Sequence, residues 1–299
     1  MSENRAVSIV IPTYNGAATI ATQLGRLIPQ LLDGDEIIVA NNRSTDDTVH
    51  VVEELAKKDP RIRTVPAVGR QGINHARNAG INHARNQFIL FCDDDDAVAD
   101  TWVADMREGL RKWPVVGGRF RLMVVGEQVT DILDHPHAFG YSYPTGGSMG
   151  VRRAVFERVG TFDESFVRGH DEVEFGIRVQ LAGYEVGNSD ALITYVQRSA
   201  PKSAYLQHFH FGRTYIQLWC RYRNSIDPGA VSLTSAVRRA IPLVVNLLPI
   251  YQNRGGLQRA KATGWQLGAA WGHLRYRILF GPPKPLIGRI RSQKMTKIR

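Results

Sequence analysis

The sequence predicts an α/β fold, a Rossmann-like, mostly parallel sheet flanked by helices, followed by a basic, helical C-terminal extension. Two observations predict the sheet. Strand-like apolar runs alternate with helix-like periodicity over residues 6–96, and the last of these runs ends in four consecutive carboxylates. The distribution of charge predicts the extension. We therefore expect residues 1–200 to form a catalytic domain and residues 201–299 a basic, mainly helical region.

The first elements are expected directly at the N-terminus, where no apolar signal region is present. Residues 6–12 are an apolar, β-rich run that ends in proline. From residue 19 to residue 32 apolar side chains recur at helical spacing, and Gly34-Asp35 ends that pattern. Residues 36–40 then form the second expected strand.

A second and a third helix are expected after polar turns. The turn at residues 41–47 offers Ser44 or Thr45 as the N-cap of a helix. Residues 61–65 form a third short strand, and residues 72–80 open another helix. Because strands and helices alternate, the strands should lie parallel, joined by helical crossovers.

The most informative stretch is the apolar run at residues 88–92, which is followed at once by Asp93, Asp94, Asp95 and Asp96. Side chains of a strand alternate, so Asp93 and Asp95 would project to one side if the extended geometry continued, and they could hold one hard cation. In isolation four acids are a solvated loop, but a buried strand that leads into them favours a functional site. In open parallel sheets, ligands bind beyond the carboxyl ends of the strands, where Thr13, Asn42 and Asp93 would meet.

The charge of the chain is unevenly distributed. The protein has 38 Lys and Arg against 28 Asp and Glu, yet residues 201–299 hold 17 of the basic residues and a single acid, Asp227. Such asymmetry predicts an anionic partner for the tail, either nucleic acid or a membrane surface. Two cysteines, Cys92 and Cys220, give no disulfide framework and fit a reducing cytoplasm.

Four segments within residues 7–96 together resemble family 2 glycosyltransferases of the GT-A fold. They are Val7-Ser-Ile-Val-Ile-Pro-Thr-Tyr-Asn15, Asn41-Asn-Arg-Ser-Thr-Asp-Asp47, Gly72–Gly80 and Asp93-Asp-Asp-Asp96. The resemblance implies a nucleotide-sugar site formed by Pro12, Thr13, Tyr14, Asn42, Arg77, Asp93 and Asp94. It also implies a DxD metal motif at Asp93 and Asp95 that binds Mg²⁺ or Mn²⁺. One departure is that Asn41 and Asn42 stand where the family usually has Asp, which bears on the base that is preferred.

The resemblance continues into the middle of the chain. The glycine cluster at residues 146–150 is similar to the acceptor-side segment of the family, and a glycine lets backbone approach a ligand closely. A helix is expected to start near Asp171, with its acids at the positive end of the dipole. The family has its catalytic base here as Glu-Asp, whereas this chain has Asp171-Glu172, so either residue is a candidate. Further on, His208 or His210 could complete the metal shell, as a histidine does in some GT-A enzymes.

The resemblance implies an inverting, metal-dependent transfer from a nucleotide-diphosphate sugar, with a UDP-sugar expected, to a hydroxyl group of a lipid-linked or cell-surface polysaccharide acceptor. One base and one metal, with no candidate protein nucleophile, imply a single displacement. Two alternatives are a sugar nucleotidyltransferase, which would need a glycine-rich basic loop after the first strand, and a basic protein that binds nucleic acid or an anionic membrane.

The C-terminal region offers a second, weaker signal. Leu267, Trp271, Leu274 and Ile278 share one helical face beside basic residues, a pattern typical of helices that lie on anionic lipid, although such a helix can equally pack on the catalytic domain. The apolar stretch at residues 240–251 is too short to span a bilayer. We therefore expect a cytoplasmic protein that associates peripherally with the inner face of the membrane.

Overall fold

The computed structural model describes residues 6–124, 127–134, 136–197, 200–226 and 256–290. Within these residues the main sheet has nine strands, in the order β3-β2-β1-β4-β10-β6-β11-β5, with β7 paired to β6. Its strands are β1 (Val7–Thr13), β2 (Glu36–Asn41), β3 (Ile62–Pro66), β4 (Phe88–Phe91), β5 (Ala97–Val98), β6 (Val115–Val124), β7 (Glu127–Leu133), β10 (Met149–Arg152) and β11 (Val186–Gln197). A separate hairpin pairs β8 (His137–Ala138) with β9 (Tyr141–Ser142).

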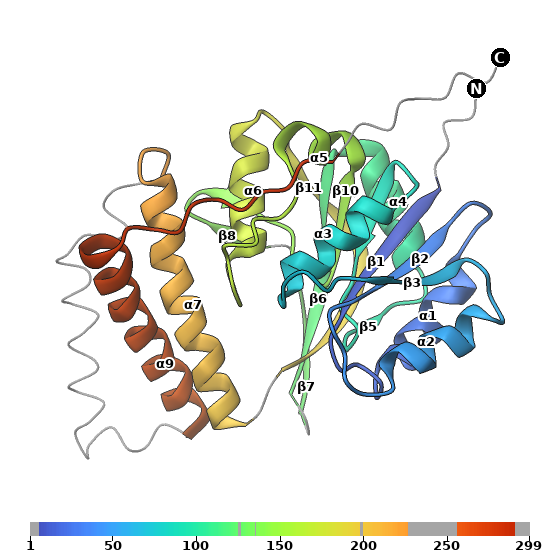
Figure 1. Cartoon of the computed structure of the whole chain (residues 1–299), viewed down its shortest axis with the longest axis horizontal. Coiled ribbons are helices and arrows are strands. Elements are labelled where there is room, and N and C mark those ends of the chain that lie inside the picture. The colour runs from blue at the N-terminus through green and yellow to red at the C-terminus, as the bar shows by residue number, and fades with distance from the viewer. Residues whose placement is uncertain (1–5, 125–126, 135, 198–199, 227–255, 291–299) are drawn as a thin grey trace.

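Helices cover both faces of this sheet (Figure 1). They are α1 (Ile20–Leu27) with the 3₁₀ turn η1 (Ile28–Gln30), α2 (Thr48–Ala56), α3 (Ile73–His83), α4 (Trp102–Lys112), α5 (Arg153–Val159), α6 (Asp171–Leu181), α7 (Pro201–Tyr222), α9 (Gly256–His273) and the π-helical turn η4 (Leu274–Leu279). None of the described helices is long and apolar enough to cross a membrane.

The N-terminal half of the sheet is parallel, as the sequence predicts. Strand β1 lies between β2 and β4, and β3 follows β2 at the edge. Because side chains alternate along a strand, Ile9 and Ile11 enter one apolar core with α1 and α4, while Val10 enters the other core with α3. Beyond β4 the sheet is mixed, since β10 runs antiparallel to both β4 and β6.

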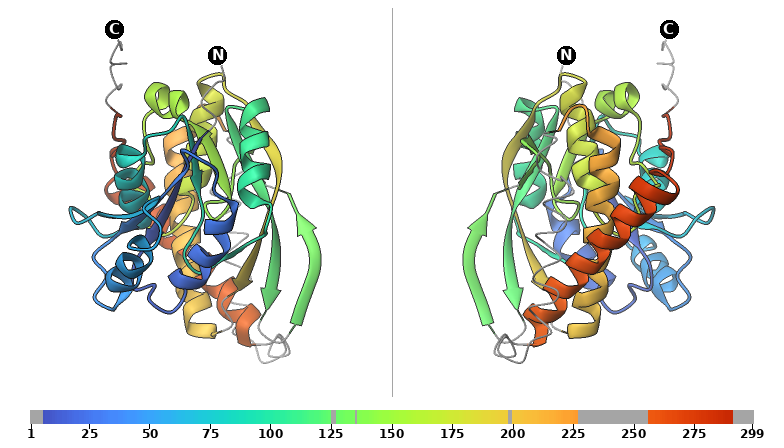
Figure 2. Two further views of the ribbon diagram at one scale, coloured as in Figure 1. Left: turned by 90° about the vertical axis from the view of Figure 1, so that its right-hand side faces the viewer. Right: turned by 90° about the vertical axis from the view of Figure 1, so that its left-hand side faces the viewer.

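Glycines hold the two long C-terminal helices together. A Cβ on Gly264 or Gly268 of α9 would overlap the backbone of Tyr205 or Phe209 in α7, and a Cβ on Gly212 of α7 would overlap Trp265. The helix axes therefore approach more closely than larger side chains would allow. Figure 2 shows α9 packed across α7, on the outer side of the molecule.

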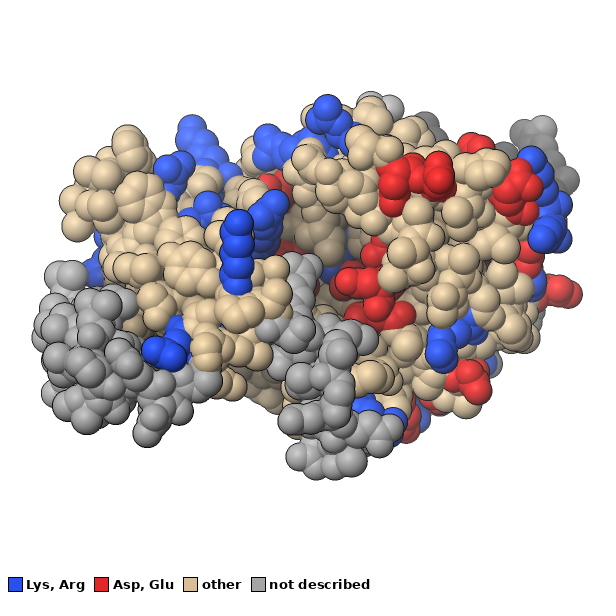
Figure 3. All heavy atoms as spheres, turned by 90° about the horizontal axis from the view of Figure 1, so that it is seen from below, with Lys and Arg blue, Asp and Glu red and all other residues tan. Residues whose placement is uncertain are grey.

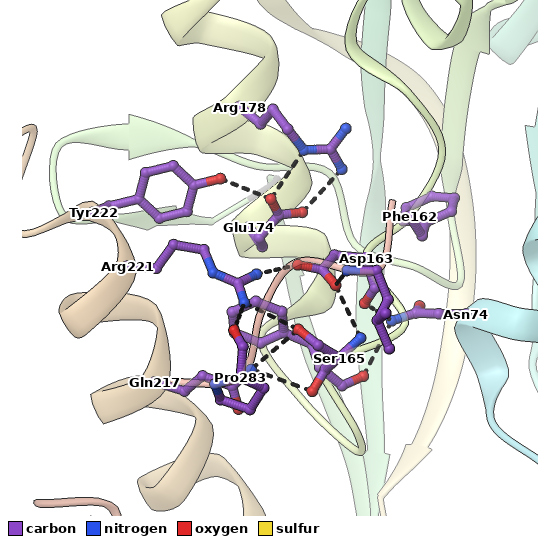
Figure 4. A network of polar contacts seen from close by, with 12 residues as sticks. Asn74, Phe162, Asp163, Ser165, Glu174, Arg178, Gln217, Arg221, Tyr222 and Pro283 are labelled. Atoms are coloured by element: carbon purple, nitrogen blue, oxygen red, sulfur yellow. Dashed lines mark hydrogen bonds and ion pairs between the residues drawn. The ribbon is translucent and has the colours of Figure 1, made fainter. Parts of the chain in front are cut away.

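Residues 281–290, which we call the strap, lead from η4 back to the body of the protein and are drawn in red across α6 in Figure 1. Asp163 forms an antiparallel bridge with Ile287, and the backbone N–H of Thr161 donates to the carbonyl of Gly288. Figure 4 shows the polar network beneath, where Arg221 of α7 pairs with buried Asp163 and donates to the carbonyl of Pro283. The strap thus ties the helix pair to the loop that precedes α6.

The predicted N-cap of the second helix is wrong. Helix α2 begins at Thr48 with Asp47 as its N-cap. Ser44 and Thr45 are engaged elsewhere, because the hydroxyl of Ser44 accepts from the N–H of Asn15 and the N–H of Thr45 donates to the Asn15 side chain. These bonds join the turn after β1 to the turn after β2.

Candidate active site

The acidic run lies where β4 ends, at the edge of the sheet that the sequence predicts for the site. The chain bends at residues 94–96 and does not continue as a strand, so the alternation that groups Asp93 with Asp95 does not apply. Asp94 lies beside Thr13 and Gly16, whereas Asp93 and Asp96 both face Gly147. Asp95 is exposed. The four carboxylates therefore surround the bend and do not share one side of it.

These carboxyl groups are poorly compensated. Burial, together with the neighbouring acids, raises the pKa of Asp96 to about 8 and that of Asp94 to about 7. Burial also raises the pKa of Asp93, and only Arg77 opposes this effect. Several acids held this closely favour a bound cation at this bend.

Arg77 of α3 connects the acidic bend to the start of α6. Its side chain is 1% exposed, and its Nη1 lies 2.8 Å from Asp171 Oδ2 and 3.6 Å from Glu172 Oε1. Its Nη2 lies 3.5 Å from Asp93 Oδ1. Burial disfavours the charge of Arg77, but Asp93, Glu172 and Asp171 outweigh this and raise its pKa. One guanidinium group thus contacts both sets of acids that the sequence singles out.

The two acids at the start of α6 differ in their surroundings. Asp171 has a side chain 4% exposed and is bound to Arg77, and burial raises its pKa well above the usual range. The side chain of Glu172 is 24% exposed. Tyr143 lies near it, and burial together with Glu172 raises the pKa of Tyr143 to about 12. Glu172 is therefore the more accessible of the two candidate bases.

Two glycines separate these groups. A Cβ on Gly146 would overlap Nη2 of Arg77 and Oε1 of Glu172, and a Cβ on Gly147 would lie 2.5 Å from Asp96 Oδ2. Only backbone fits between the acidic bend and the base candidates, which agrees with the close approach predicted for this cluster. Figure 3 shows acidic side chains beside a hollow near the middle of this face of the molecule.

The nucleotide side of the site is formed by the ends of β1 and β2. Pro12 and Thr13 are buried at the end of β1, and Tyr14 is 50% exposed just after it. Asn42 has no free polar atom, because its amide donates to the carbonyls of Ala67 and Arg70 and accepts from the N–H of Gly72. Asn42 therefore shapes the loop at residues 67–72, and its side chain is not available to read a base.

The histidines considered for the metal shell, His208 and His210, lie on α7. His208 bonds through Nδ1 to the carbonyl of Ala204, and it lines a groove with Lys261 and Trp265 between α7 and α9. Burial lowers the pKa of His210, as do Arg213 and Arg168 nearby. Among the described residues, no three His, Cys, Asp or Glu side chains form a group that could hold a metal ion alone. The contacts of His208 with α7 and α9 therefore do not favour it as a metal ligand.

Sequence reasoning missed two parts of the site. Asp96 was seen only as one acid of the run, although its carboxylate is the one that most closely faces Gly147. The side chains of Asn74 and Asn78 hold the backbone of Asp163 and Phe162, which fixes α3 and therefore Arg77 against the loop before α6. The sequence shows that these asparagines lie on the same predicted helix as Arg77. It does not predict their hydrogen-bond partners, which lie some 85 residues away.

A family model described as glycosyl transferase family 2 matches residues 8–160, which is 153 of the 299 residues. The chain belongs to glycosyl transferase family 2. The matched segment contains β1, Arg77, the acidic bend and the glycine pair, and it ends before the base candidates of α6. Membership identifies the protein as a glycosyltransferase, which decides against a sugar nucleotidyltransferase and against a protein whose only role is binding.

Relatives of this glycosyltransferase agree with the assignment. It is 26% identical over 216 residues to the uncharacterized glycosyltransferase EpsJ of Bacillus subtilis, a match that covers 66% of this chain and 62% of EpsJ. It is 32% identical over 102 residues to WfgD of Escherichia coli, named as a UDP-Glc:α-D-GlcNAc-diphosphoundecaprenol β-1,3-glucosyltransferase, covering 34% of this chain and 38% of WfgD. The chain thus spans less than two thirds of these relatives.

A solved structure confirms the GT-A-like fold. The mannosyltransferase PcManGT from Pyrobaculum calidifontis, determined with GDP-Man and Mn²⁺, superposes with a TM-score of 0.63 at 18% identity. The superposition covers 90% of this chain and 86% of PcManGT. The likeness therefore extends well past the matched family segment.

Proposed function

We propose that this glycosyltransferase moves a sugar from a UDP-sugar to a hydroxyl group of a lipid-linked or cell-surface polysaccharide acceptor, with inversion and with the help of Mg²⁺ or Mn²⁺. The observation that carries the proposal is the contact of Arg77 with Asp93 on one side and with Asp171 and Glu172 on the other. A group of acids suited to a metal and diphosphate thereby lies next to a candidate base.

The residues at the acidic bend fit a divalent cation. Burial and mutual repulsion raise the pKa values of Asp93, Asp94 and Asp96, so a cation would relieve an unfavourable cluster. Although the chain bends after Asp93, Asp95 remains close enough for its charge to raise the pKa of Asp93, so these two carboxylates would hold the cation. Because no complete protein cage is present in the described residues, phosphate oxygens would supply further ligands. When bound, the cation neutralises the diphosphate and makes it a better leaving group.

The protein groups then supply orientation and proton transfer. Glu172 accepts the proton of the acceptor hydroxyl as the oxygen bonds to the anomeric carbon. The bond from that carbon to the phosphate oxygen breaks, and the nucleoside diphosphate leaves with the electron pair. Arg77 holds Glu172 toward the acceptor side and places positive charge near the departing phosphate. A single displacement of this kind inverts the configuration of the sugar.

The choice of donor and acceptor rests on the relatives. WfgD carries UDP-Glc and a diphosphoundecaprenol acceptor in its name, and we extend this chemistry to the present enzyme. An acceptor of this kind lies in a membrane, so we place the enzyme in the cytoplasm, at the inner face of the cell membrane.

The test is a transfer assay. The purified chain is incubated with a panel of UDP-sugars and GDP-mannose, a lipid-linked saccharide fraction, and Mn²⁺, Mg²⁺ or EDTA, and both labelled product and released diphosphate are measured. We expect metal-dependent transfer from one UDP-sugar, abolished in Glu172→Gln and retained in Glu108→Gln, a control on the exposed face of α4. Transfer that persists in EDTA, or in Glu172→Gln, would contradict the proposal.

A further inference from the structure

The outer side of α9 and η4 carries a row of exposed apolar side chains. Leu267, Trp271, Leu274 and Ile278 follow one another at helical spacing, and Phe280 continues the row. Ile278 is 70% exposed and Phe280 is 75% exposed. The adjacent side of α9 is already occupied, because its glycines pack against α7. We call these five residues the apolar row.

The apolar row borders an open groove. Leu267, Trp271 and Leu274 line it from α9, and Tyr205 and Phe209 line it from α7, enclosing a volume of about 390 Å³. Surfaces of this kind are rare on soluble monomers unless they bind a partner or a membrane. The row and the groove share Leu267, Trp271 and Leu274. The helices that carry them lie at the end of the molecule opposite α1 and α2 (Figure 1).

The charge around this surface is of one sign. Residues 200–226 and 256–290 contain ten Lys and Arg and no Asp or Glu. Arg275 lies next to the row, with its guanidinium 5.8 Å from the ring centroid of Phe280. Arg277 lies over Trp219, 4.7 Å from its ring centroid. The positive charges are thus held close to the apolar side chains.

We propose that the apolar row, with Arg275 and Arg277, docks on an anionic phospholipid surface. The apolar side chains would enter the interface between headgroups and acyl chains, and the arginines would meet the phosphates. A second copy of the chain fits poorly, because its surface would bring cations against cations. Nucleic acid would satisfy the arginines but would leave the apolar row in water.

The orientation that follows suits the proposed reaction. With α9 on the membrane, the edge of the sheet formed by β1, β2 and β3 faces away from the lipid, where a soluble nucleotide sugar can reach it (Figure 1). The inference deepens the proposed function, because a lipid-linked acceptor is met at a membrane. Binding to lipid is nevertheless measurable without any transfer, so the two proposals can fail separately.

The test is co-sedimentation of the full chain with vesicles of phosphatidylcholine alone or with 30% phosphatidylglycerol, at low and high salt. We expect binding to the anionic vesicles only. We expect a loss of about tenfold or more in the partition coefficient for Ile278→Ser/Phe280→Ser, since both changes remove exposed apolar area that would enter the lipid. Arg275→Gln should weaken binding and reduce its dependence on salt.

Leu32→Ser is the matched control, because Leu32 is 59% exposed but lies at the opposite end of the molecule, after η1. All variants should keep the melting temperature of the parent and its stabilisation by nucleoside diphosphate with Mn²⁺. The proposal is overturned if anionic vesicles do not bind the parent, if neutral vesicles bind it equally well, or if Leu32→Ser loses as much binding as the double variant. It is also overturned if duplex DNA displaces the vesicles and binds the double variant unchanged.

Discussion

At the residue scale, the two adjacent acids of α6 differ in accessibility and in partner. Asp171 is buried against Arg77, and Glu172 is the accessible one. The sequence predicted that one of them is the base but could not choose, because sequence order does not show which carboxylate the helix start turns inward. The structure supplies that orientation.

We predict that Glu172→Gln lowers kcat by a factor of about 10² to 10⁴, with little change in donor binding, because the amide cannot accept the proton. Asp171→Asn should instead lower the melting temperature, since it weakens a buried charged hydrogen bond while Arg77 keeps Asp93 and Glu172 as partners, a change that costs about 1.5–3 kcal/mol. Steady-state kinetics and thermal unfolding of both variants check that Glu172 acts mainly on kcat and Asp171 mainly on stability. Equal losses of kcat and of stability in the two variants would contradict it.

His170, just before α6, predicts how stability depends on pH. It has positive φ, and its ring lies beside Thr214 and Phe211. Burial lowers its pKa to about 4 in the folded protein, while the unfolded chain keeps an ordinary value of about 6.5. The unfolded state therefore binds this proton more readily between these values, so His170 on its own lowers stability as pH drops through this window. Asp94 and Asp96 act in the opposite direction, because their raised pKa values make the folded state bind protons more readily.

The measurement is the free energy of unfolding between pH 7 and pH 5, where His170 contributes a loss of about 2 kcal/mol at most. His170→Asn retains a side chain that tolerates positive φ and cannot titrate, so the loss should become smaller. His50→Asn, at an exposed position of α2, is the control. An unchanged slope in His170→Asn would show that other groups cause it.

Asn42 marks the limit of prediction at this scale. The sequence correctly predicts that Asn42 follows β2. It also predicts that the amide of Asn42 influences which nucleotide base is preferred. In the structure its three polar contacts all go to backbone of the loop at residues 67–72. A motif position can be identified from sequence, but the atoms that saturate a side chain lie in a loop whose path the sequence does not specify.

At the element scale, the parallel half of the sheet was predictable because each of its strands is a short apolar run bounded by turn residues. The antiparallel pairing of β10 with β4 and β6 was not, since it depends on a long excursion of the chain. The sequence also predicted the apolar row on α9. The glycines of α9 follow a four-residue spacing that could have predicted the close contact with α7.

We predict that Gly268→Ala destabilises the protein, because the added methyl group would overlap the carbonyl of Phe209 and must push the helices apart. The expected cost is about 1–3 kcal/mol in the free energy of unfolding. Gly25→Ala is the matched control, since Gly25 lies within α1 and a Cβ there meets nothing within 4 Å. It should be neutral or slightly stabilising. Equal effects of both changes would argue against close packing of the two helices.

A second prediction at the element scale concerns how the strap is held in place. Arg221 pairs with fully buried Asp163 and also binds Ser165 and Pro283. Arg221→Met should leave the Asp163 carboxylate uncompensated and lower the free energy of unfolding by about 3–5 kcal/mol. Limited proteolysis should then cut the strap near Lys284 sooner than in the parent. Arg223→Met, at an exposed position after α7, serves as the control. Unchanged cleavage in Arg221→Met would mean that the strap is held by its backbone bonds alone.

At the scale of the whole molecule, the acidic and the basic residues lie in different parts of the protein. Acidic side chains lie near the middle and on the right of the face in Figure 3, whereas the described C-terminal residues 200–226 and 256–290 contain Lys and Arg but no Asp or Glu. The division at residue 200 remains a prediction, although α7 does begin at Pro201. The strap shows that the C-terminal region also returns to the catalytic body, which no pattern in residues 281–290 indicated.

The most direct test of the central claim is thermal unfolding of the parent and of Asp95→Asn with UDP or GDP, each with Mn²⁺ or with EDTA. A ligand that binds only the folded state at 100 times its Kd stabilises by about 2.7 kcal/mol, which shifts the melting temperature by several degrees. We predict that UDP with Mn²⁺ stabilises the parent, that EDTA abolishes the shift, and that Asp95→Asn loses it. An equal shift in EDTA, or in Asp95→Asn, would contradict a nucleotide-diphosphate site built on the metal at the acidic bend.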